Sequence, residues 1–365
     1  MDVKELKQIP FFFIVGTARS GTTMLQQILD SNPNLILPIE SKFIIHLKKI
    51  YQFEKNWTDK KINCLLDDLY KERHFKQYWA LDREKVRNKI NEIPKEELRF
   101  DLICKQIYLC YNSIYPKGKI NLIGDKNPVY AIYIDLLKEV FPDAKFIHII
   151  RDYRPNALSN SLAFTGKNIP FFAAQWKLYN TLIEKQKKIS PDRFYTIRYE
   201  DLVTEPEKYV KEICGFLGIE FNSTMLDFYI QTNKTYKDKN IEGFERFHQG
   251  VLKPITSAEL DSWKQKLNAQ KIEMLEYIAG NYGEKYGYKK SIAPAKSSFF
   301  FISMRAKWNC FKDYFIFRMY YTMPVFLRRS ISFTTTRLYR LVNFKHAYNK
   351  HDISVVEGVE NNMEN

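Results

Sequence analysis

The stretch Phe11-Phe12-Phe13-Ile14-Val15-Gly16-Thr17-Ala18-Arg19-Ser20-Gly21-Thr22-Thr23 decides how the rest of the chain can be read. An apolar run is followed by a loop between two glycines, and apolar residues then recur at helical spacing from Met24 to Leu29. Strand, glycine-bounded loop and helix in this order form a phosphate cradle, because the loop's backbone N–H groups converge and the helix N-terminus favours an anion. The alternative is a tight strand-to-helix turn that holds no ligand.

The charge in this loop has an unusual source. The two glycines have the spacing of a Walker A loop, but Thr22 stands where that loop carries its lysine. The positive charge comes instead from Arg19, inside the loop. This substitution indicates a nucleotide donor other than Mg-ATP.

Composition limits the class of protein. With 365 residues and 45% hydrophobic content, the chain can bury a full α/β core and still carry an appendage. The net charge of +15 predicts anionic partners such as phosphate, sulfate, nucleic acid or an acidic membrane. Five scattered cysteines without a CxxC pair argue for a reducing compartment and against a zinc site. With a polar N-terminus and no run of 18 apolar residues, we expect a cytoplasmic protein.

Strand and helix patterns alternate along most of the chain. Strands are expected at 11–15, 35–37, 120–124, 144–150 and 193–198. Helices are expected within 41–115 and at 129–140, 169–189, 205–217, 257–267 and 269–279, and the polar segment 232–254 is expected to be a loop that folds over a bound ligand. This alternation predicts an α/β protein with a P-loop-type parallel sheet flanked by helices, a three-layer α/β/α arrangement. We expect a catalytic domain over 1–290 and a helical C-terminal appendage over 291–365.

Each of the five predicted strands is followed by a charged or polar residue at the same edge of the sheet. In parallel sheets, ligands bind beyond the carboxyl ends of the strands. The residues expected there are Arg19, Glu40, Lys126, Arg151 and Tyr199.

A second anion site is predicted after the fourth of these strands. Arg151 ends that strand, and Ser159 lies eight residues later on the helix that follows. With Arg154 nearby, this arginine and hydroxyl could hold a phosphate well separated from the one in the glycine-bounded loop. The alternative is that Arg151 pairs with Asp152 or Glu200.

Several motifs together resemble the PAPS-dependent sulfotransferases, in particular the branch with protein-tyrosine and many bacterial sulfotransferases (PAPS is 3′-phosphoadenosine 5′-phosphosulfate). The resemblance covers about residues 10 to 290. The motifs that carry it are Gly16–Thr23, Pro38–Ser41, Gly124–Pro128, Arg151–Ser159 and Arg198–Leu202, with Leu252–Ile255 and Trp263 towards the end.

The resemblance implies a role for each matching residue. Arg19, Ser20, Gly21, Thr22 and Thr23 would hold the 5′-phosphosulfate of PAPS. Arg151 and Ser159 would hold its 3′-phosphate, Tyr199 would lie near the adenine, and Lys253 would contact the donor phosphates. Glu40 would be the catalytic base, with Lys126 and Arg19 stabilising charge. The loop lysine of the cytosolic branch is absent, and the segment before Lys253 matches poorly, so no contacts are assigned to 240–250.

These roles agree with the chemistry of sulfuryl transfer. An in-line transfer through a loose transition state depends on positioning and charge stabilisation, by analogy with phosphoryl transfer. The attacking hydroxyl must lose its proton, which requires a base within hydrogen-bond reach. Glu40 is the preferred base; His46 remains a rival, and His148 is expected to be a core residue. PAP (adenosine 3′,5′-bisphosphate) would be the product, and no metal is expected because no carboxylate cluster would hold Mg²⁺.

Two other classes of protein compete with this reading. A P-loop kinase would need a lysine at position 22 and an aspartate at a strand end for Mg²⁺. A non-catalytic protein that binds nucleic acid would use the charge of +15, but no nucleic-acid-binding motif is present. The acceptor hydroxyl is left open: a steroid, lipid or other small alcohol is favoured, and a polysaccharide or glycolipid is the alternative.

The C-terminal segment suggests a membrane surface. From Lys296 to Lys350 there are eleven Lys or Arg residues, one acid and fifteen aromatic residues. Basic and aromatic residues mixed in this way suit the interface of an anionic membrane. We therefore expect peripheral contact with the inner face of a membrane through 296–350. The alternative is a helical appendage that packs its aromatic residues on the catalytic domain.

Overall fold

A computed structural model describes residues 2–72, 75–164, 166–239, 249–291 and 299–323. Its centre is a five-stranded, fully parallel sheet with the strand order β2-β3-β1-β4-β5. The strands are β1 Phe11–Val15, β2 Leu35–Ile36, β3 Leu122–Lys126, β4 Lys145–Ile150 and β5 Phe194–Arg198. The predicted fold class, a parallel sheet flanked by helices, is confirmed.

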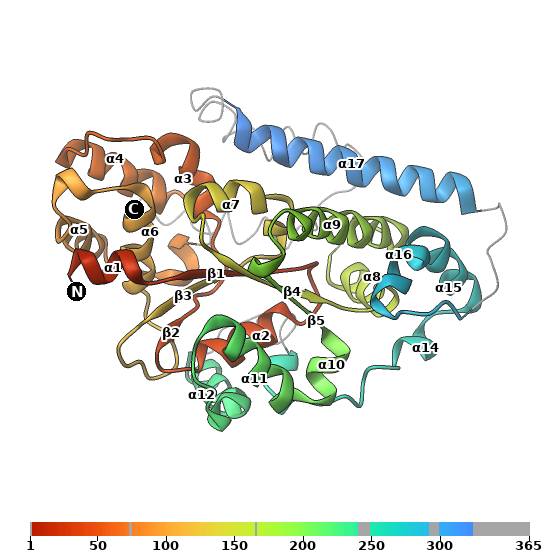
Figure 1. The fold of residues 1–365 in the computed structure, drawn as a ribbon. Helices are drawn as coiled ribbons and strands as arrows, with labels where there is room; N and C mark the ends of the chain where they lie inside the picture. The colour runs from red at the N-terminus through yellow and green to blue at the C-terminus, as the bar shows by residue number, and fades with distance from the viewer. Residues whose placement is uncertain (1, 73–74, 165, 240–248, 292–298, 324–365) are drawn as a thin grey trace, which may run out of the picture.

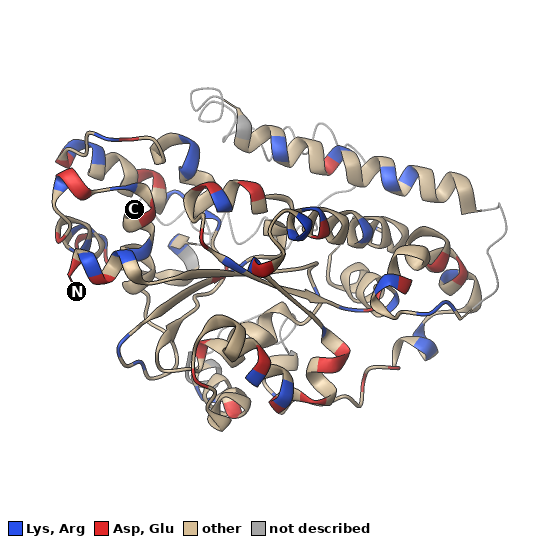
Figure 2. Cartoon of the chain, in the orientation of Figure 1, with Lys and Arg blue, Asp and Glu red and all other residues tan. Residues whose placement is uncertain are grey.

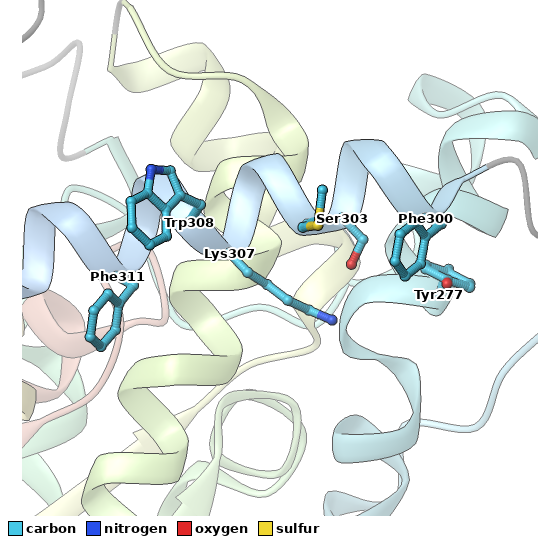
Figure 3. A pocket seen from close by; sticks show the side chains of 7 residues that line it. Tyr277, Phe300, Ser303, Lys307, Trp308 and Phe311 are labelled. Atoms are coloured by element: carbon cyan, nitrogen blue, oxygen red, sulfur yellow. The ribbon is translucent and has the colours of Figure 1, made fainter.

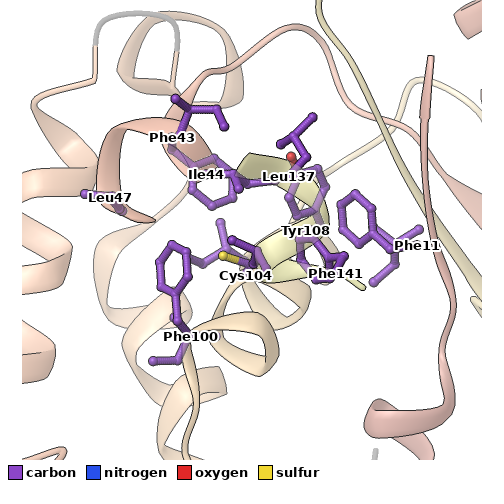
Figure 4. Packing of buried hydrophobic residues seen from close by; sticks show 14 of the residues in the cluster. Phe11, Phe43, Ile44, Leu47, Phe100, Cys104, Tyr108, Leu137 and Phe141 are labelled. Carbon is purple, nitrogen blue, oxygen red and sulfur yellow. The ribbon is translucent and has the colours of Figure 1, made fainter. Parts of the chain in front are cut away.

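The five residues of β1 are buried on both faces of the sheet, which explains why they form an unbroken apolar run. Phe11, Phe13 and Val15 pack into one apolar cluster, while Phe12 and Ile14 pack into the cluster on the opposite face. In the first cluster the Phe11 ring stacks on Phe141 at 4.1 Å between ring centroids and meets the edge of Tyr108 at 5.1 Å (Figure 4).

Helices cover both faces of the sheet (Figure 1). One face carries α2 Thr22–Asp30, α10 Tyr199–Thr204, α11 Pro206–Leu217 and α12 Phe228–Lys239. The other carries α3 Phe43–Tyr51, α6 Phe100–Leu109, α7 Ile134–Val140 and α9 Ile169–Ile189. The remaining helices are α1 Val3–Gln8, α4 Asp59–Tyr70, α5 Arg83–Asn91, α8 Tyr153–Ala163, α14 Trp263–Lys266, α15 Ala269–Leu275, α16 Asn281–Gly283 and α17 Phe300–Thr322.

Short helical turns complete the chain: η1 Phe75–Trp79, η2 Lys95–Glu97, η3 Pro128–Ile132, η4 Pro191–Arg193, η5 Ser223–Asp227, η6 Gln249–Val251, η7 Glu276–Gly280 and η8 Glu284–Tyr286. The outermost helix, α17, runs along α9 on the side away from the sheet (Figure 1). Within the described residues, none of the helices combines the length and apolar character that crossing a membrane requires. The predicted membrane segment 296–350 lies outside the described residues apart from 299–323.

Three predicted boundaries are wrong. The third strand extends two residues beyond its predicted end at Gly124, because Asp125 and Lys126 continue to pair with Phe13 and Ile14 of β1. Much of the predicted loop 232–254 is helical, since α12 continues to Lys239; the part 240–248 lies outside the described residues. The predicted helix 257–267 is reduced to the single turn of α14.

The connections from neighbouring strands separate at β1. The chain leaves β1 through α2 on one face of the sheet, whereas β3 and β4 continue through η3–α7 and α8–α9 towards the other face. Where neighbouring strands send their connections to opposite faces, the loops separate and leave room for a ligand. The glycine-bounded loop after β1 therefore lies at the edge where β3 and β4 also end.

A buried carboxyl ties two of these strand ends together. Asp125 is fully buried in β3, and its Oδ2 lies 2.7 Å from the Tyr130 hydroxyl, which lies 2.9 Å from the Ser41 carbonyl oxygen. Tyr130 has one phenolic proton, so both bonds form only when Asp125 is protonated and donates to Tyr130. Burial raises the pKa of Asp125 to about 7, partly opposed by the nearby Tyr108 and Tyr130 hydroxyls.

This carboxyl should make stability depend on pH. The pKa of Asp125 is higher in the folded state than in the unfolded state. The contribution of Asp125 to the free energy of unfolding is therefore complete at acidic pH and is lost as the pH rises through about 7. We expect the free energy of unfolding to fall by about 2 kcal/mol more in the wild type than in Asp125→Asn between pH 5 and pH 8. Urea titrations at both pH values measure this difference. The exposed Asp67→Asn variant serves as control, and equal pH dependence in wild type and Asp125→Asn would contradict the assignment.

Candidate active site

The glycine-bounded loop is held close to β4 and α10 by the absence of side chains at its two glycines. A Cβ atom on Gly16 would lie 2.4 Å from the Ile149 carbonyl oxygen, and one on Gly21 would lie 2.4 Å from the Tyr199 ring. Gly21 has φ +89° and precedes the first residue of α2. Arg19 also has a positive φ of 63°, a strained conformation that non-glycine residues adopt where their surroundings require it.

Two asparagines of α8 fix the loop from the side. The Asn156 amide donates to the Ala18 carbonyl oxygen at 2.8 Å and to the Ser20 hydroxyl at 3.0 Å. Asn160, one turn later, donates to the same Ala18 oxygen at 3.0 Å. Sequence reasoning missed both residues. Their signal was present, because two asparagines four residues apart on one helix face flank the predicted Ser159.

Arg19, Ser159 and Arg151 lie in direct contact, whereas the sequence predicts Arg151 and Ser159 as a site well separated from the loop of Arg19. The Arg19 Nε donates to Ser159 Oγ at 3.1 Å, and the Arg151 guanidinium donates to the Arg19 carbonyl oxygen at 3.1 Å. Burial and the positive charge of Arg151 lower the pKa of Arg19. The Arg151 guanidinium also stacks on Tyr199, 4.6 Å from the ring centroid. Two cations held against each other in this way favour an anion between them.

The predicted alternative partners of Arg151 are occupied by other groups. Asp152 forms an ion pair with Arg154 at 2.6 Å, and Glu200 accepts from the Asp152 backbone N–H and from Tyr288. Within the described residues, the Arg151 Nε is buried and has no hydrogen-bond partner. A buried donor without a partner is costly, so this atom is suited to an anionic ligand.

Arg154 is not placed to bind a phosphate, which corrects its predicted role. It is buried between Asp152 and Glu276, with a second ion pair of 3.1 Å to Glu276. Its guanidinium also lies over the Trp263 ring at 4.6 Å from the centroid. Both charge partners and the ring hold it inside the protein, so it anchors the start of α8.

A second cluster lies on the other side of the loop. The Lys126 ammonium is 2.5 Å from Glu40 Oε1 and donates to Thr23 Oγ1 at 3.2 Å. Lys126 is 2% exposed, whereas the Glu40 side chain is 31% exposed. The carboxylate that faces this buried ammonium is therefore the partner that a molecule arriving from solvent can reach.

The segment that carries Glu40 is fixed from three sides. The Gln26 amide of α2 donates to the Pro38 carbonyl oxygen at 2.5 Å, and the Trp79 indole donates to the Ile39 carbonyl oxygen at 2.8 Å. Ser41, directly after Glu40, donates to Glu72 Oε2 at 2.9 Å. Trp79 and Glu72 lie in the helical region between β2 and β3, which therefore positions Glu40.

The other predicted residues have different positions. Ser20 and Thr22 are buried in the loop and at the start of α2, and Ser20 Oγ bonds to Thr17 Oγ1 at 2.8 Å. Lys253 is exposed just after η6, which packs on α2; the described contacts do not join Lys253 to Arg151.

His148 is fully buried and bonded to Asn180, and burial lowers its pKa to about 4, so it is a neutral core residue. The rival base His46 lies on α3.

The geometry therefore provides an anion site and a proton acceptor on either side of one loop. Among the described residues, His, Cys, Asp and Glu form no group of three that could hold a metal ion. The anion site and the proton acceptor together can hold an anionic group near a hydroxyl and take up that hydroxyl's proton.

Comparison with known proteins places this arrangement in a family. A family model described as the sulfotransferase family matches residues 10–223. The chain is 24% identical over 282 residues to the protein-tyrosine sulfotransferase of Drosophila melanogaster, which covers 75% of this chain and 50% of that protein. It is 33% identical over 135 residues to the omega-hydroxy-beta-dihydromenaquinone-9 sulfotransferase of Mycobacterium tuberculosis, covering 32% and 34% of the two chains. The chain thus spans only about half of the fly protein.

The prediction of a cytoplasmic location is wrong. The relatives include animal protein-tyrosine sulfotransferases, and those proteins are Golgi membrane enzymes. Scattered cysteines and a polar N-terminus therefore do not assign a compartment to this chain.

The fold is also found among solved structures. The sulfotransferase domain of the Synechococcus olefin synthase superposes with a TM-score of 0.52 at 22% identity, covering 77% of this chain and 95% of that domain. This likeness concerns the fold alone, whereas the family model covers more than half of the sequence. The chain belongs to the sulfotransferase family.

Proposed function

We propose that this protein transfers the sulfuryl group of PAPS to an acceptor hydroxyl by in-line displacement, releasing PAP. The observation that carries the proposal is that one loop joins two sites. Arg19 in the loop meets Ser159 and Arg151, while Thr23 at the end of the loop meets Lys126 and, through it, Glu40. Membership of the sulfotransferase family supports the same reaction.

The donor would lie along the loop with its two anionic ends apart. Arg151, whose buried Nε lacks a partner among the described residues, and Ser159 would hold the 3′-phosphate. Arg19, Ser20, Gly21, Thr22 and Thr23 would hold the 5′-phosphosulfate through the backbone and the N-terminus of α2. Tyr199 would support the adenosine beside Arg151, and Lys253 would contact the donor phosphates.

Glu40 and Lys126 would share the work of the transfer step. As the acceptor oxygen bonds to sulfur, its proton passes to Glu40, and the bond from sulfur to the bridging oxygen of the nucleotide breaks. Lys126 and Arg19 would stabilise the negative charge that builds on this leaving oxygen. The ion pair between Lys126 and Glu40 keeps the two groups together, which supports a shared role in this step.

The acceptor is proposed to be the hydroxyl of a steroid, lipid or other small alcohol. The match to a relative named for a hydroxylated dihydromenaquinone supports an apolar alcohol, and the protein-tyrosine relatives also use a hydroxyl acceptor. A polysaccharide or glycolipid is the alternative. Incubation with labelled PAPS and cell extracts, followed by separation into lipid, glycan and protein fractions, tests this. Label in lipid alone supports the proposal, label in glycan supports the alternative, and no label anywhere contradicts the activity.

Replacing Arg151 by alanine should separate the two ends of the nucleotide. Loss of a charge-assisted contact typically weakens binding by about 10- to 100-fold. We expect this loss for adenosine 3′,5′-bisphosphate and little change for adenosine 5′-phosphate, measured by calorimetry without metal. Arg193→Ala, which removes a surface arginine paired with Asp143, is the matched control. Equal losses for both nucleotides would falsify the assignment of the 3′-phosphate, and tighter binding of ATP would favour a kinase-like protein.

Replacing Glu40 by glutamine should leave the donor site intact and remove the base. Removal of a general base typically lowers turnover by about 10²- to 10⁴-fold. The affinity for adenosine 3′,5′-bisphosphate should stay within about twofold of the wild type, because Glu40 is not proposed to touch the nucleotide. Glu207→Gln on the surface of α11 is the control. Near-normal turnover of Glu40→Gln would transfer the role to His46 or another group.

A further inference from the structure

The outward side of α17 exposes a continuous row of large apolar side chains. We define the outer face of α17 by its exposed members, which are Phe301, Met304, Trp308, Phe311, Phe315 and Met319. Their spacing of three or four residues places them in one stripe along the helix. Single exposed apolar residues are ordinary, but a contiguous row along a 23-residue helix marks an interaction surface.

The opposite side of α17 is already used. Ala306, Cys310 and Asp313 are buried there, and the helix packs against α9 and α3. Asp313, the only acid in α17, pairs with Lys167 at 2.8 Å. Arg318 pairs with Asp135 at 2.7 Å. The inner contacts therefore take up the helix's one negative charge and leave the outer face without an acid.

Cations remain beside the outer face. Arg305, Lys307 and Lys312 lie on α17, and Figure 2 shows blue segments along this helix. Burial and the neighbouring ammonium groups of Lys307 and Lys285 lower the pKa of Lys177 on α9. Among the described residues, Lys177 and Lys307 have no ion pair with an acid. Uncompensated like charges at one place attract an anionic partner.

A pocket of about 410 Å³ lies between one of these cations, Lys307, and the apolar row. Its lining residues are Tyr277, Phe300, Ser303, Met304, Lys307, Trp308 and Phe311. Figure 3 shows the Lys307 ammonium and the Ser303 hydroxyl directed towards the space beside Phe300 and Tyr277. Ser303 is 2% exposed, and its Oγ has no hydrogen-bond partner among the described residues. A hydroxyl and an ammonium beside aromatic rings suit a phosphate with an attached acyl chain.

We propose that the outer face of α17 lies on an anionic membrane surface, with the pocket at Lys307 and Ser303 taking the phosphate headgroup of an anionic phospholipid. The aromatic and methionine side chains enter the headgroup boundary, and Arg305, Lys307 and Lys312 meet the negative surface. The proposal does not depend on the sulfotransferase activity, because it rests on α17 and its neighbours. A membrane is favoured over a protein partner because all the exposed charged residues of α17 that border the apolar row are cations.

The tryptophans of the chain allow a direct test with the full-length protein. Trp308 is 65% exposed, whereas the other four tryptophans, Trp57, Trp79, Trp176 and Trp263, are at most 6% exposed. Iodide should therefore quench mainly Trp308 in solution. On vesicles of phosphatidylglycerol and phosphatidylcholine this quenching should fall, and brominated acyl chains should quench the same residue. The brominated-lipid signal should disappear in Trp308→Phe.

Co-sedimentation without PAPS measures the strength of the contact. The double variant Phe301→Ser, Phe315→Ser should weaken binding to the mixed vesicles at least about tenfold, because two rings no longer enter the interface. Lys307→Gln should weaken it about fivefold and reduce the preference for phosphatidylglycerol over pure phosphatidylcholine. Phe53→Ser and Lys211→Gln, which change exposed residues elsewhere, are the matched controls.

Several outcomes would overturn the proposal. Equal binding of wild type and double variant to anionic vesicles would show that another surface makes the contact. Lack of binding by the folded wild type would exclude the membrane as the occupant. A dimer in sedimentation velocity that the double variant converts to monomer would identify a second copy of the chain as the partner. Inorganic phosphate that protects Trp308 from iodide as well as vesicles do would indicate a site for free phosphate.

Discussion

The bond from the Asn156 side chain to the glycine-bounded loop is the interaction on which the candidate site depends. It connects α8 to Ala18 and Ser20, so the helix that carries Ser159 and the loop that carries Arg19 cannot move apart independently. Arg19, which has a positive φ, lies between the two residues that Asn156 holds, and its Nε donates to Ser159 Oγ. The backbone of β1 delivers the loop, and α8 sets its shape.

Holding the guanidinium groups of Arg19 and Arg151 together costs free energy. Contacts with the surrounding structure offset this cost. Arg151 is restrained through its carbonyl oxygen, which accepts from the Trp176 indole at 2.8 Å, and through its stacking on Tyr199. Asp152 could neutralise it but is bound to Arg154 instead. Arg154 thus keeps the neighbouring acid away from Arg151. With Asp152 held by Arg154, the positive charge of Arg151 remains suited to an anionic ligand.

The sequence predicts those features that arise from local chemistry. The apolar run of β1, the glycines at 16 and 21 and the limits of α9 follow from burial, backbone conformation and helical periodicity, and the structure agrees with them. Pairing across the sheet is not local, so the extension of β3 into Asp125 and Lys126 was missed. The same holds for Arg154, whose partner Glu276 lies 122 residues away. Whether an arginine is available for a ligand depends on such distant acids.

Helix α17 shows why an amphipathic pattern is an incomplete guide. A helix with one buried face alternates between apolar and polar sides, but α17 is apolar on both, since Ala306 and Cys310 pack inward while Phe301, Trp308 and Phe315 face outward. The sequence pattern predicts either packing on the rest of the protein or contact with a membrane. The two are compatible, because they use opposite sides of the same helix. The inner side supplies the fixed support that an outer, interfacial side requires, since most of a helix's stability in a protein comes from packing one face against its neighbours.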